Sequence, residues 1–132
     1  GMVRLLVVEP GYCPYIANFD NVQSAAQEVV CGESEVILPF GTPKIGLICS
    51  RDQSGLRYNR CINEDDIHVY GRFLICGMNG DKPIGLTKEQ AERYSRLYFQ
   101  PQNPCQNVDD FPVAKVRPKD ERYGQKPRFW ER

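Results

Sequence analysis

The stretch that decides the fold is VRLLVV, residues Val3–Val8, in which every side chain except Arg4 is apolar. A strand with one face in water alternates apolar and polar residues, whereas a strand covered on both faces is apolar throughout. The run therefore predicts a strand in the interior of the protein. Glu9, Pro10 and Gly11 follow as a turn signal, so residues Tyr15–Phe19 are predicted to return as the second strand of a hairpin.

Two amphipathic segments are predicted to be helices. Apolar residues recur at helical spacing after Asp20, which predicts a helix over 21–31 with Asp20 as its N-cap. The second helix is predicted over 87–99, where Thr87 and Gln90 have the spacing of a capping box. Each helix has one apolar face that must be buried, so both are expected to cover a sheet.

Three further apolar stretches predict the remaining strands, at 35–40, 44–49 and 67–76, with a bulge at Gly71 in the last. The order is then strand, strand, helix, strand, strand, long loop, strand, helix. Because strands and helices do not alternate strictly, a doubly wound parallel sheet is disfavoured. We expect an α+β fold, with a mostly antiparallel sheet of about five strands covered by two helices.

Composition and charge divide the chain into two parts. The protein has 41% hydrophobic and 26% charged residues, which is ordinary for a globular protein. No apolar run is long enough for a signal peptide or a membrane span, so a cytoplasmic protein with no membrane partner is expected. Residues 1–111 have a charge balance of −4 and residues 112–132 a balance of +4. We predict one domain over 2–100 and an extended, proline-rich tail over 101–132.

The six cysteines are expected to be reduced. Disulfides are rare in chains without an export signal. No Cys-x-x-Cys pair is present, so the usual anchor of a zinc site is missing. Cys49 and Cys76 each end an apolar run, where a cysteine acts as a small hydrophobic residue. No metal and no cofactor are predicted.

Four stretches together resemble one protein family: VRLLVVEPG (3–11), ICSRDQSGLRYNRCI (48–62), VYGRFLICG (69–77) and LTKEQAERYSRLYF (86–99). It is a family of small uncharacterised bacterial proteins, a domain of unknown function often carried by phages and conjugative elements. The resemblance covers residues 3–100 and implies a small α+β domain with no known reaction. The family's Asn-Arg pair is matched by Asn59 and Arg60, and its Gly-x-Phe by Gly71 and Phe73. An Asn of the family pattern is replaced by Ser50.

The predicted recognition surface combines the polar loop before the strand at 67–76 with Arg72 of that strand. Arginine side chains on short loops suit the capture of phosphate or carboxylate groups through forked hydrogen bonds. In the structural alternative, Asn59 bonds to nearby backbone, and Arg60 pairs with Glu64 or Asp65 and fastens the loop. The predicted ligand is an unknown protein or a small anion. The predicted binding residues are Arg57, Asn59, Arg60 and Arg72.

The leading functional hypothesis is a non-enzymatic binding or accessory module of a mobile genetic element. The first alternative is nucleic-acid binding by the tail, in which basic residues are interleaved with aromatic rings. In a structural alternative for the same tail, Val113, Val116 and Trp130 pack on the acidic domain. The tail aromatics are Phe111, Tyr123, Phe129 and Trp130.

The second alternative is an enzyme that uses Cys61 and His68, or a metal site of Glu64, Asp66 and His68. A cysteine nucleophile usually needs a neighbouring base, and His68 is the only histidine. The acidic run beside Cys61 raises a thiol pKa and opposes this role. No other ligand cluster occurs in the sequence, so no catalytic residue and no metal ligand are assigned.

Overall fold

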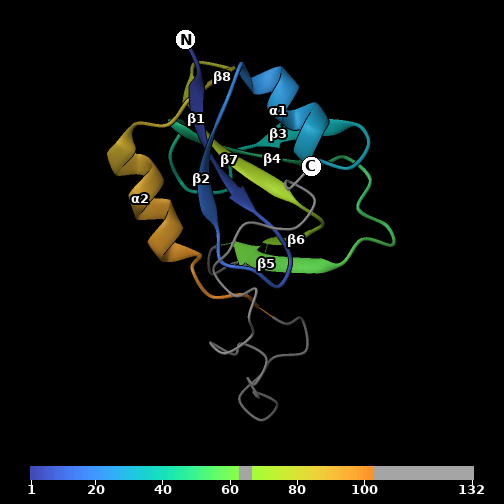
Figure 1. The fold of residues 1–132 in the computed structure, drawn as a ribbon. Coiled ribbons are helices and arrows are strands. Elements are labelled where there is room, and N and C mark those ends of the chain that lie inside the picture. Colours follow the sequence, from blue (N-terminus) through green and yellow to red (C-terminus); the bar gives the residue numbers. More distant parts are fainter. Residues whose placement is uncertain (63–66, 103–132) are drawn as a thin grey trace.

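The described part of the protein is an antiparallel sheet with one helix on each face and a small second sheet at one end (Figure 1). The structure, a computed structural model, describes residues 1–62 and 67–102. The main sheet has the order β2-β1-β7-β4-β3, with β8 also paired to β7, and the small sheet is formed by β5 and β6. The strands are β1 (Val3–Val8), β2 (Tyr15–Phe19), β3 (Ser34–Ile37), β4 (Ile45–Ser50), β5 (Tyr58–Ile62), β6 (Ile67–Tyr70), β7 (Phe73–Asn79) and β8 (Lys82–Ile84), and the helices are α1 (Val22–Val29) and α2 (Lys88–Leu97).

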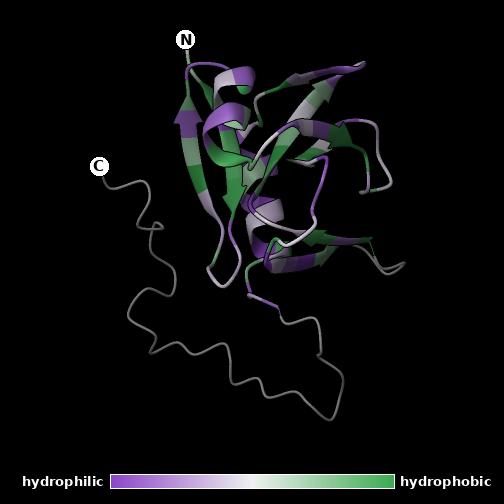
Figure 2. Ribbon diagram, turned by 90° about the vertical axis from the view of Figure 1, so that its right-hand side faces the viewer, coloured by the Kyte–Doolittle hydropathy of each residue, from purple (hydrophilic) through white to green (hydrophobic). Residues whose placement is uncertain are grey.

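The two faces of the main sheet are buried under different helices. In β1, Leu5 and Val7 belong to the hydrophobic cluster that includes α1, whereas Leu6 and Val8 belong to the cluster that includes α2. Figure 2 shows hydrophobic residues along the central strands, whereas the helices carry many hydrophilic residues. Successive side chains of a strand point to opposite faces, so cover on both faces explains the continuous apolar run. The predicted α+β class and the interior strand Val3–Val8 are both confirmed.

Both helices begin at capping residues. The hydroxyl of Thr87 accepts a hydrogen bond from the backbone N–H of Gln90 at 3.0 Å, and the Gln90 side chain accepts one from the N–H of Thr87 at 2.9 Å. The predicted capping box of α2 is therefore confirmed. In α1 the N-cap is Asn21 rather than Asp20, because the Asn21 side chain accepts from the N–H of Ser24 at 2.7 Å. The helix is accordingly shorter than the predicted span of 21–31.

The segment before β7 differs from the prediction of one strand over 67–76. The chain leaves the small sheet after β6 and enters the main sheet with β7. Gly71 lies at this corner with φ of 86°, a left-handed conformation in which an L side chain is strained. A Cβ at this position would also lie 2.7 Å from Cδ1 of Leu56. The corner therefore requires glycine and separates two strands of two different sheets.

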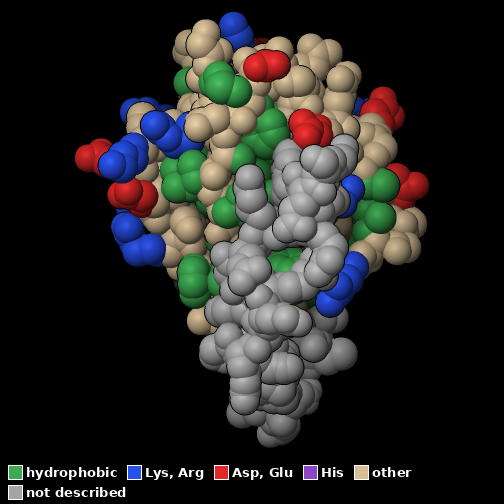
Figure 3. Space-filling model, viewed as in Figure 1, with side chains coloured by type: hydrophobic (Ala, Val, Ile, Leu, Met, Phe, Trp, Pro, Cys, Tyr) green, Lys and Arg blue, Asp and Glu red, His purple; other side chains and the backbone are tan. Residues whose placement is uncertain are grey.

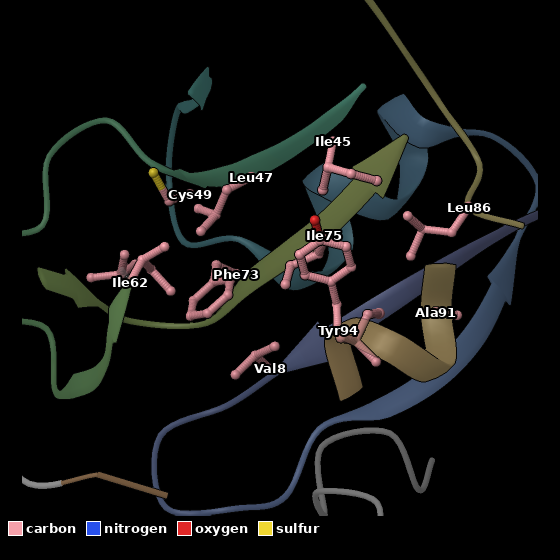
Figure 4. Packing of buried hydrophobic residues seen from close by; sticks show 12 residues of the cluster. Val8, Ile45, Leu47, Cys49, Ile62, Phe73, Ile75, Leu86, Ala91 and Tyr94 are labelled. Carbon is pink, nitrogen blue, oxygen red and sulfur yellow. The ribbon is translucent and has the colours of Figure 1, made fainter. Parts of the chain in front are cut away.

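Two strands lie in segments that were predicted as connections. β8 has only three residues, one of which is Pro83. β5 lacks an apolar alternation because Asn59 and Arg60 are buried polar residues. Ile62 of β5 lies near Phe73 in the cluster that α2 also covers (Figure 4). The small sheet and α2 therefore cover the same face of the main sheet.

Two predicted parts of the chain lie outside the described residues. They are the acidic run with Glu64 and Asp66, and the tail after Gln102, so the prediction of a separate tail stays a prediction. The Gln102 side chain accepts a hydrogen bond from the backbone N–H of Cys61 at 2.9 Å. No helix within residues 1–62 and 67–102 is long and apolar enough to cross a membrane.

Candidate functional site

The four predicted binding residues differ in their exposure. Asn59 and Arg60 have no exposed surface at all. Arg72 is half-buried and Arg57 is exposed. A fully buried arginine is rare, because removing a guanidinium from water is unfavourable unless every donor finds an acceptor. The contacts of Asn59 and Arg60 therefore define what these side chains do in the fold.

Asn59 joins three segments through its side-chain amide. Its Nδ2 donates to the carbonyl oxygen of Val8 at 3.0 Å and to that of Gly71 at 2.8 Å. Its Oδ1 accepts from Nη1 of Arg60 at 2.8 Å. The amide thus ties the end of β1 to the corner at Gly71, and it orients the neighbouring guanidinium.

Arg60 joins β5 to two other parts of the chain. Its Nη2 donates to the carbonyl oxygen of Tyr12 at 2.8 Å, and its Nε donates to that of Tyr98 at 3.1 Å. Tyr98 is the C-cap of α2, where the last carbonyl groups lack partners within the helix. A cation at a helix C-terminus is favourable both as a donor and through the helix dipole. We call Asn59 and Arg60 together the Asn-Arg clamp.

Arg72 makes the corresponding contact with the other helix. Its Nε donates to the carbonyl oxygen of Val29, the last residue of α1, at 2.8 Å. Arg60 and Arg72 therefore each bind the C-terminal end of one helix, on opposite faces of the sheet. Arg57 is different, because its guanidinium lies over Gly11, where a Cβ added to that glycine would be 3.4 Å from Nη2. The binding role of the four residues stays a prediction.

Cys61 and His68 are brought together by the small sheet. They are directly opposite each other in the β5–β6 register, so both side chains project from the same face. The Tyr58 hydroxyl and Nδ1 of His68 lie 2.8 Å apart and share a hydrogen bond. The Tyr58 ring also contacts Tyr70, with centroids 5.2 Å apart. Asp66 and Glu64 lie outside the described residues, and the described ranges contain no group of three potential metal ligands.

A groove of about 840 Å³ runs along one flank of α1, between that helix and strands β3 and β8. Val36 and Ile84 keep 41% and 37% of their surfaces exposed, although both are apolar. The charged residues in the lining are Glu33 and Lys82. We call this the α1 groove. Its apolar lining comes chiefly from Val3, Val22, Ala26, Val36, Ile48 and Ile84.

The chain matches one known family. A family model described as a domain of unknown function (DUF3846) matches residues 3–99, a range that includes every described strand and helix. The chain belongs to this family. The resemblance to a domain of unknown function that the sequence motifs indicated is thereby confirmed. No curated protein and no solved structure matches the chain.

Two cysteines of this DUF3846 domain are packing residues, as the sequence predicts. Cys49 and Cys76 are buried in the two hydrophobic clusters. Burial raises the pKa of the Cys49 thiol to about 11, with a smaller contribution from Glu35, and burial likewise raises the pKa of Cys76 to about 11. Both thiols therefore stay protonated, and unreactive, at neutral pH.

Sequence reasoning missed the α1 groove of the DUF3846 domain. Its lining residues are spread along the chain from Val3 to Gly85, so no local motif marks them. One signal is visible in hindsight: Val36 is an apolar residue in an edge strand, on the face that α1 only partly covers. The pairing of Cys61 with His68 was considered from the sequence, but the contribution of Tyr58 was missed.

Proposed function

We propose that this DUF3846 domain is a non-enzymatic binding module whose ligand site is the α1 groove. The observation that carries the proposal is the groove itself, which is open, largely apolar and about 840 Å³ in volume. Sites for small molecules and for apolar side chains of partners typically have this size and a few polar groups at the margin. Exposed apolar surface that clusters in one place also favours a binding role.

The chemistry of the groove defines the ligand class. Ile48 and Val36 contribute apolar lining that suits an apolar group. Glu33 and Lys82 offer one charge of each sign. A ligand with an apolar body and one polar end satisfies both parts. Arg57 is exposed but does not line the groove, so the predicted recognition of an anion by Arg57 is a separate contact from the groove ligand.

A fragment screen by ligand-observed NMR, with amide shift mapping of the hits, tests the groove. Hits are expected to shift amides of Val22, Ala26 and Ile48. Val36→Lys places a charge in the groove and is expected to weaken binding by at least about tenfold, equal to 1.4 kcal/mol. Leu38→Lys is the matched control, since Leu38 is 51% exposed and does not line the groove. Equal binding by both variants would contradict the proposal.

We also propose that the module serves a mobile genetic element. The support is the family resemblance carried by the sequence motifs of residues 3–100, which implies carriage by phages and conjugative elements. The neighbouring genes test this role: integrase, relaxase or phage structural genes on either side are expected. Housekeeping genes on both sides, in several genomes that carry the gene, would remove this part of the proposal.

A second candidate function is thiol chemistry at Cys61. It is favoured by the cross-strand pair of Cys61 and His68 and by the hydrogen bond that the Tyr58 hydroxyl and Nδ1 of His68 share. In the tautomer in which Nδ1–H of His68 donates to the Tyr58 hydroxyl, Nε2 is the basic nitrogen, and a base oriented by a third group can activate a neighbouring nucleophile. The half-buried position of Cys61 also leaves the thiol partly accessible to a reagent.

Iodoacetamide labelling read by peptide mass spectrometry tests this candidate. At pH 7, Cys61 is expected to react faster than exposed Cys31, while buried Cys49 and Cys76 stay unmodified. His68→Ala is expected to slow Cys61 labelling by about tenfold, the effect of one pKa unit on the thiolate fraction. If Cys61 reacts no faster than Cys31, or if His68→Ala has no effect, the thiol is structural.

A further inference from the structure

β3 forms one edge of the main sheet, and its outer side presents backbone groups that a further strand can pair with. Among the strands that the structure describes, β3 pairs only with β4, at consecutive positions without a bulge. The N–H of Arg51 donates to the carbonyl oxygen of Glu33 at 2.8 Å, so these two residues form a hydrogen-bonded pair. Bonded and non-bonded pairs alternate along an antiparallel ladder. The N–H and C=O groups of Ser34 and Val36 therefore point away from β4.

The same edge lines the α1 groove. Ser34 and Val36 belong to the lining, together with Ile48, which lies opposite Val36 in the β3–β4 register. Ile48 is part of the hydrophobic cluster that includes α1, so the Val36 side chain lies on the α1 face of the sheet. A residue that pairs with Val36 from the outer side places its side chain on this face too. A strand added to β3 therefore directs alternate side chains toward the α1 groove.

The opposite face of β3 carries an acidic residue. Glu35 is half-buried and lies opposite Cys49, which belongs to the hydrophobic cluster that includes α2. Burial, and to a smaller extent the carboxylate of Glu35, raises the pKa of the Cys49 thiol, so this carboxylate lies near the thiol. The protonated thiol gives Glu35 no cation across β4. A basic residue of an added strand, opposite Glu35 on the outer side, supplies one.

The outer surface of α2 has a different character from this edge. Figure 3 shows Lys, Arg, Asp and Glu side chains interspersed over α2, at the left of the view. Mixed charges of this kind are typical of a helix face in contact with water. In the α1 groove, by contrast, Val36 of β3 and Ile84 of β8 are exposed apolar residues. Apolar surface beside an open strand edge favours a partner at the β3 side of the sheet.

An extended peptide satisfies the backbone, the groove and the charge together. Its backbone pairs with Ser34 and Val36, and its side chains alternate between the two faces of the sheet. The peptide residues opposite Ser34 and Val36 are then apolar, and the residue between them, opposite Glu35, is Lys or Arg. A second copy of β3 fits less well, because its sequence SEVI has no basic residue to place opposite Glu35.

We propose that β3 and the α1 groove together bind an extended peptide of a partner protein, which adds to the main sheet as an antiparallel strand with the pattern apolar, basic, apolar. This inference rests on the proposed ligand site and names its partner class. Ser34 and Val36 offer one N–H and one C=O group each, so the paired stretch is short. The apolar side chains in the groove must therefore contribute much of the affinity.

An NMR titration of the full chain with the acetylated and amidated peptide Thr-Leu-Lys-Leu-Thr tests the proposal. N-methylation of one leucine keeps its side chain but removes a backbone donor, and is expected to weaken binding at least about tenfold. Glutamate in place of the peptide lysine is expected to weaken binding about threefold. Glu35→Lys is expected to reverse this preference, whereas Glu92→Lys, at an exposed position of α2, is the matched control and leaves it unchanged.

Amide hydrogen exchange locates the bound peptide. At saturating peptide, the amides of Ser34 and Val36 are expected to exchange at least about tenfold more slowly, while the amides bonded to β4 keep their rates. Slow exchange of Ser34 and Val36 without peptide overturns the proposal. If it is independent of protein concentration, another segment of the chain occupies the edge, and if it increases with concentration, a second copy does.

The peptide and the fragments of the proposed ligand site fail in distinguishable ways. If the N-methylated peptide binds as tightly as the unmodified one, strand addition is wrong, although the groove still takes a ligand. If no peptide binds while fragments shift groove amides, the peptide inference fails and the proposed ligand site stands. If neither peptide nor fragments bind, both proposals fail. Weaker binding of peptide and fragments alike by Val36→Lys, with the N-methylation effect present in the unchanged protein, supports both.

Discussion

Replacing Arg60 with methionine is expected to lower the free energy of unfolding by about 3 kcal/mol. The change removes hydrogen bonds to the carbonyl oxygens of Tyr12 and Tyr98 and to Oδ1 of Asn59, all within a fully buried site. An unpaired buried acceptor costs about 1–3 kcal/mol. Methionine keeps most of the apolar volume and avoids the desolvation of the guanidinium, so part of the loss is offset.

Urea unfolding followed by far-ultraviolet circular dichroism measures this effect. Arg57→Met is the matched control, because Arg57 lies three residues away but is exposed, and a change within about 0.5 kcal/mol is expected for it. Arg60→Lys is expected to recover only part of the loss, since one ammonium cannot replace three donors of a planar fork. If Arg60→Met and Arg57→Met unfold at the same urea concentration, the clamp does not stabilise the fold.

The same variants separate the clamp from the predicted binding role. If Asn59 or Arg60 contributes to recognition, its replacement weakens the binding of groove fragments in the folded protein by more than Leu38→Lys does, a change outside the groove. If the variants lower stability and leave fragment binding unchanged, the side chains act only within the fold. The contacts with Val8, Gly71, Tyr12 and Tyr98 are the reason to expect the second result.

The sequence predicts those parts of the fold whose signals are local. β1 is an uninterrupted apolar run and α2 has its capping box within four residues, so both are predicted correctly. β5 is missed because its burial depends on distant partners: Arg60 bonds to residues 48 and 38 positions away. Asn and Arg side chains are usually exposed, so their presence in a strand predicts a strand face in water. Their burial in β5 is favourable only because carbonyl groups of other segments accept their hydrogen bonds.

The candidate sites illustrate the same limit. The motif singled out Asn59 and Arg60, but it could not tell whether their donors point to a ligand or to the chain itself. The α1 groove is lined by residues of β1, α1, β3, β4 and β8. These residues extend along the sequence from Val3 to Gly85, which is most of the domain. The Cys61–His68 pair depends on the β5–β6 register, and that register follows from a strand the sequence does not predict.

Replacing Asn59 with leucine is expected to lower the free energy of unfolding by about 3 kcal/mol as well, for a different reason. The change leaves the carbonyl oxygens of Val8 and Gly71 without their donor, and it removes the acceptor of Arg60 Nη1. A buried charged donor that loses an acceptor is among the most unfavourable outcomes. Asn79→Leu, at an exposed asparagine that ends β7, is expected to be nearly neutral.

The double variant Asn59→Leu/Arg60→Met decides whether the two residues act as one unit. Once Arg60 is gone, the loss of Asn59 no longer leaves a charge partly unsatisfied. The loss of unfolding free energy in the double variant is therefore expected to be smaller than the sum of the two single losses by about 1–2 kcal/mol. Additive effects would mean that Asn59 stabilises the corner at Gly71 independently of the guanidinium. A positive coupling would show that the Asn-Arg clamp is one hydrogen-bonded unit that joins β1, the small sheet and the end of α2.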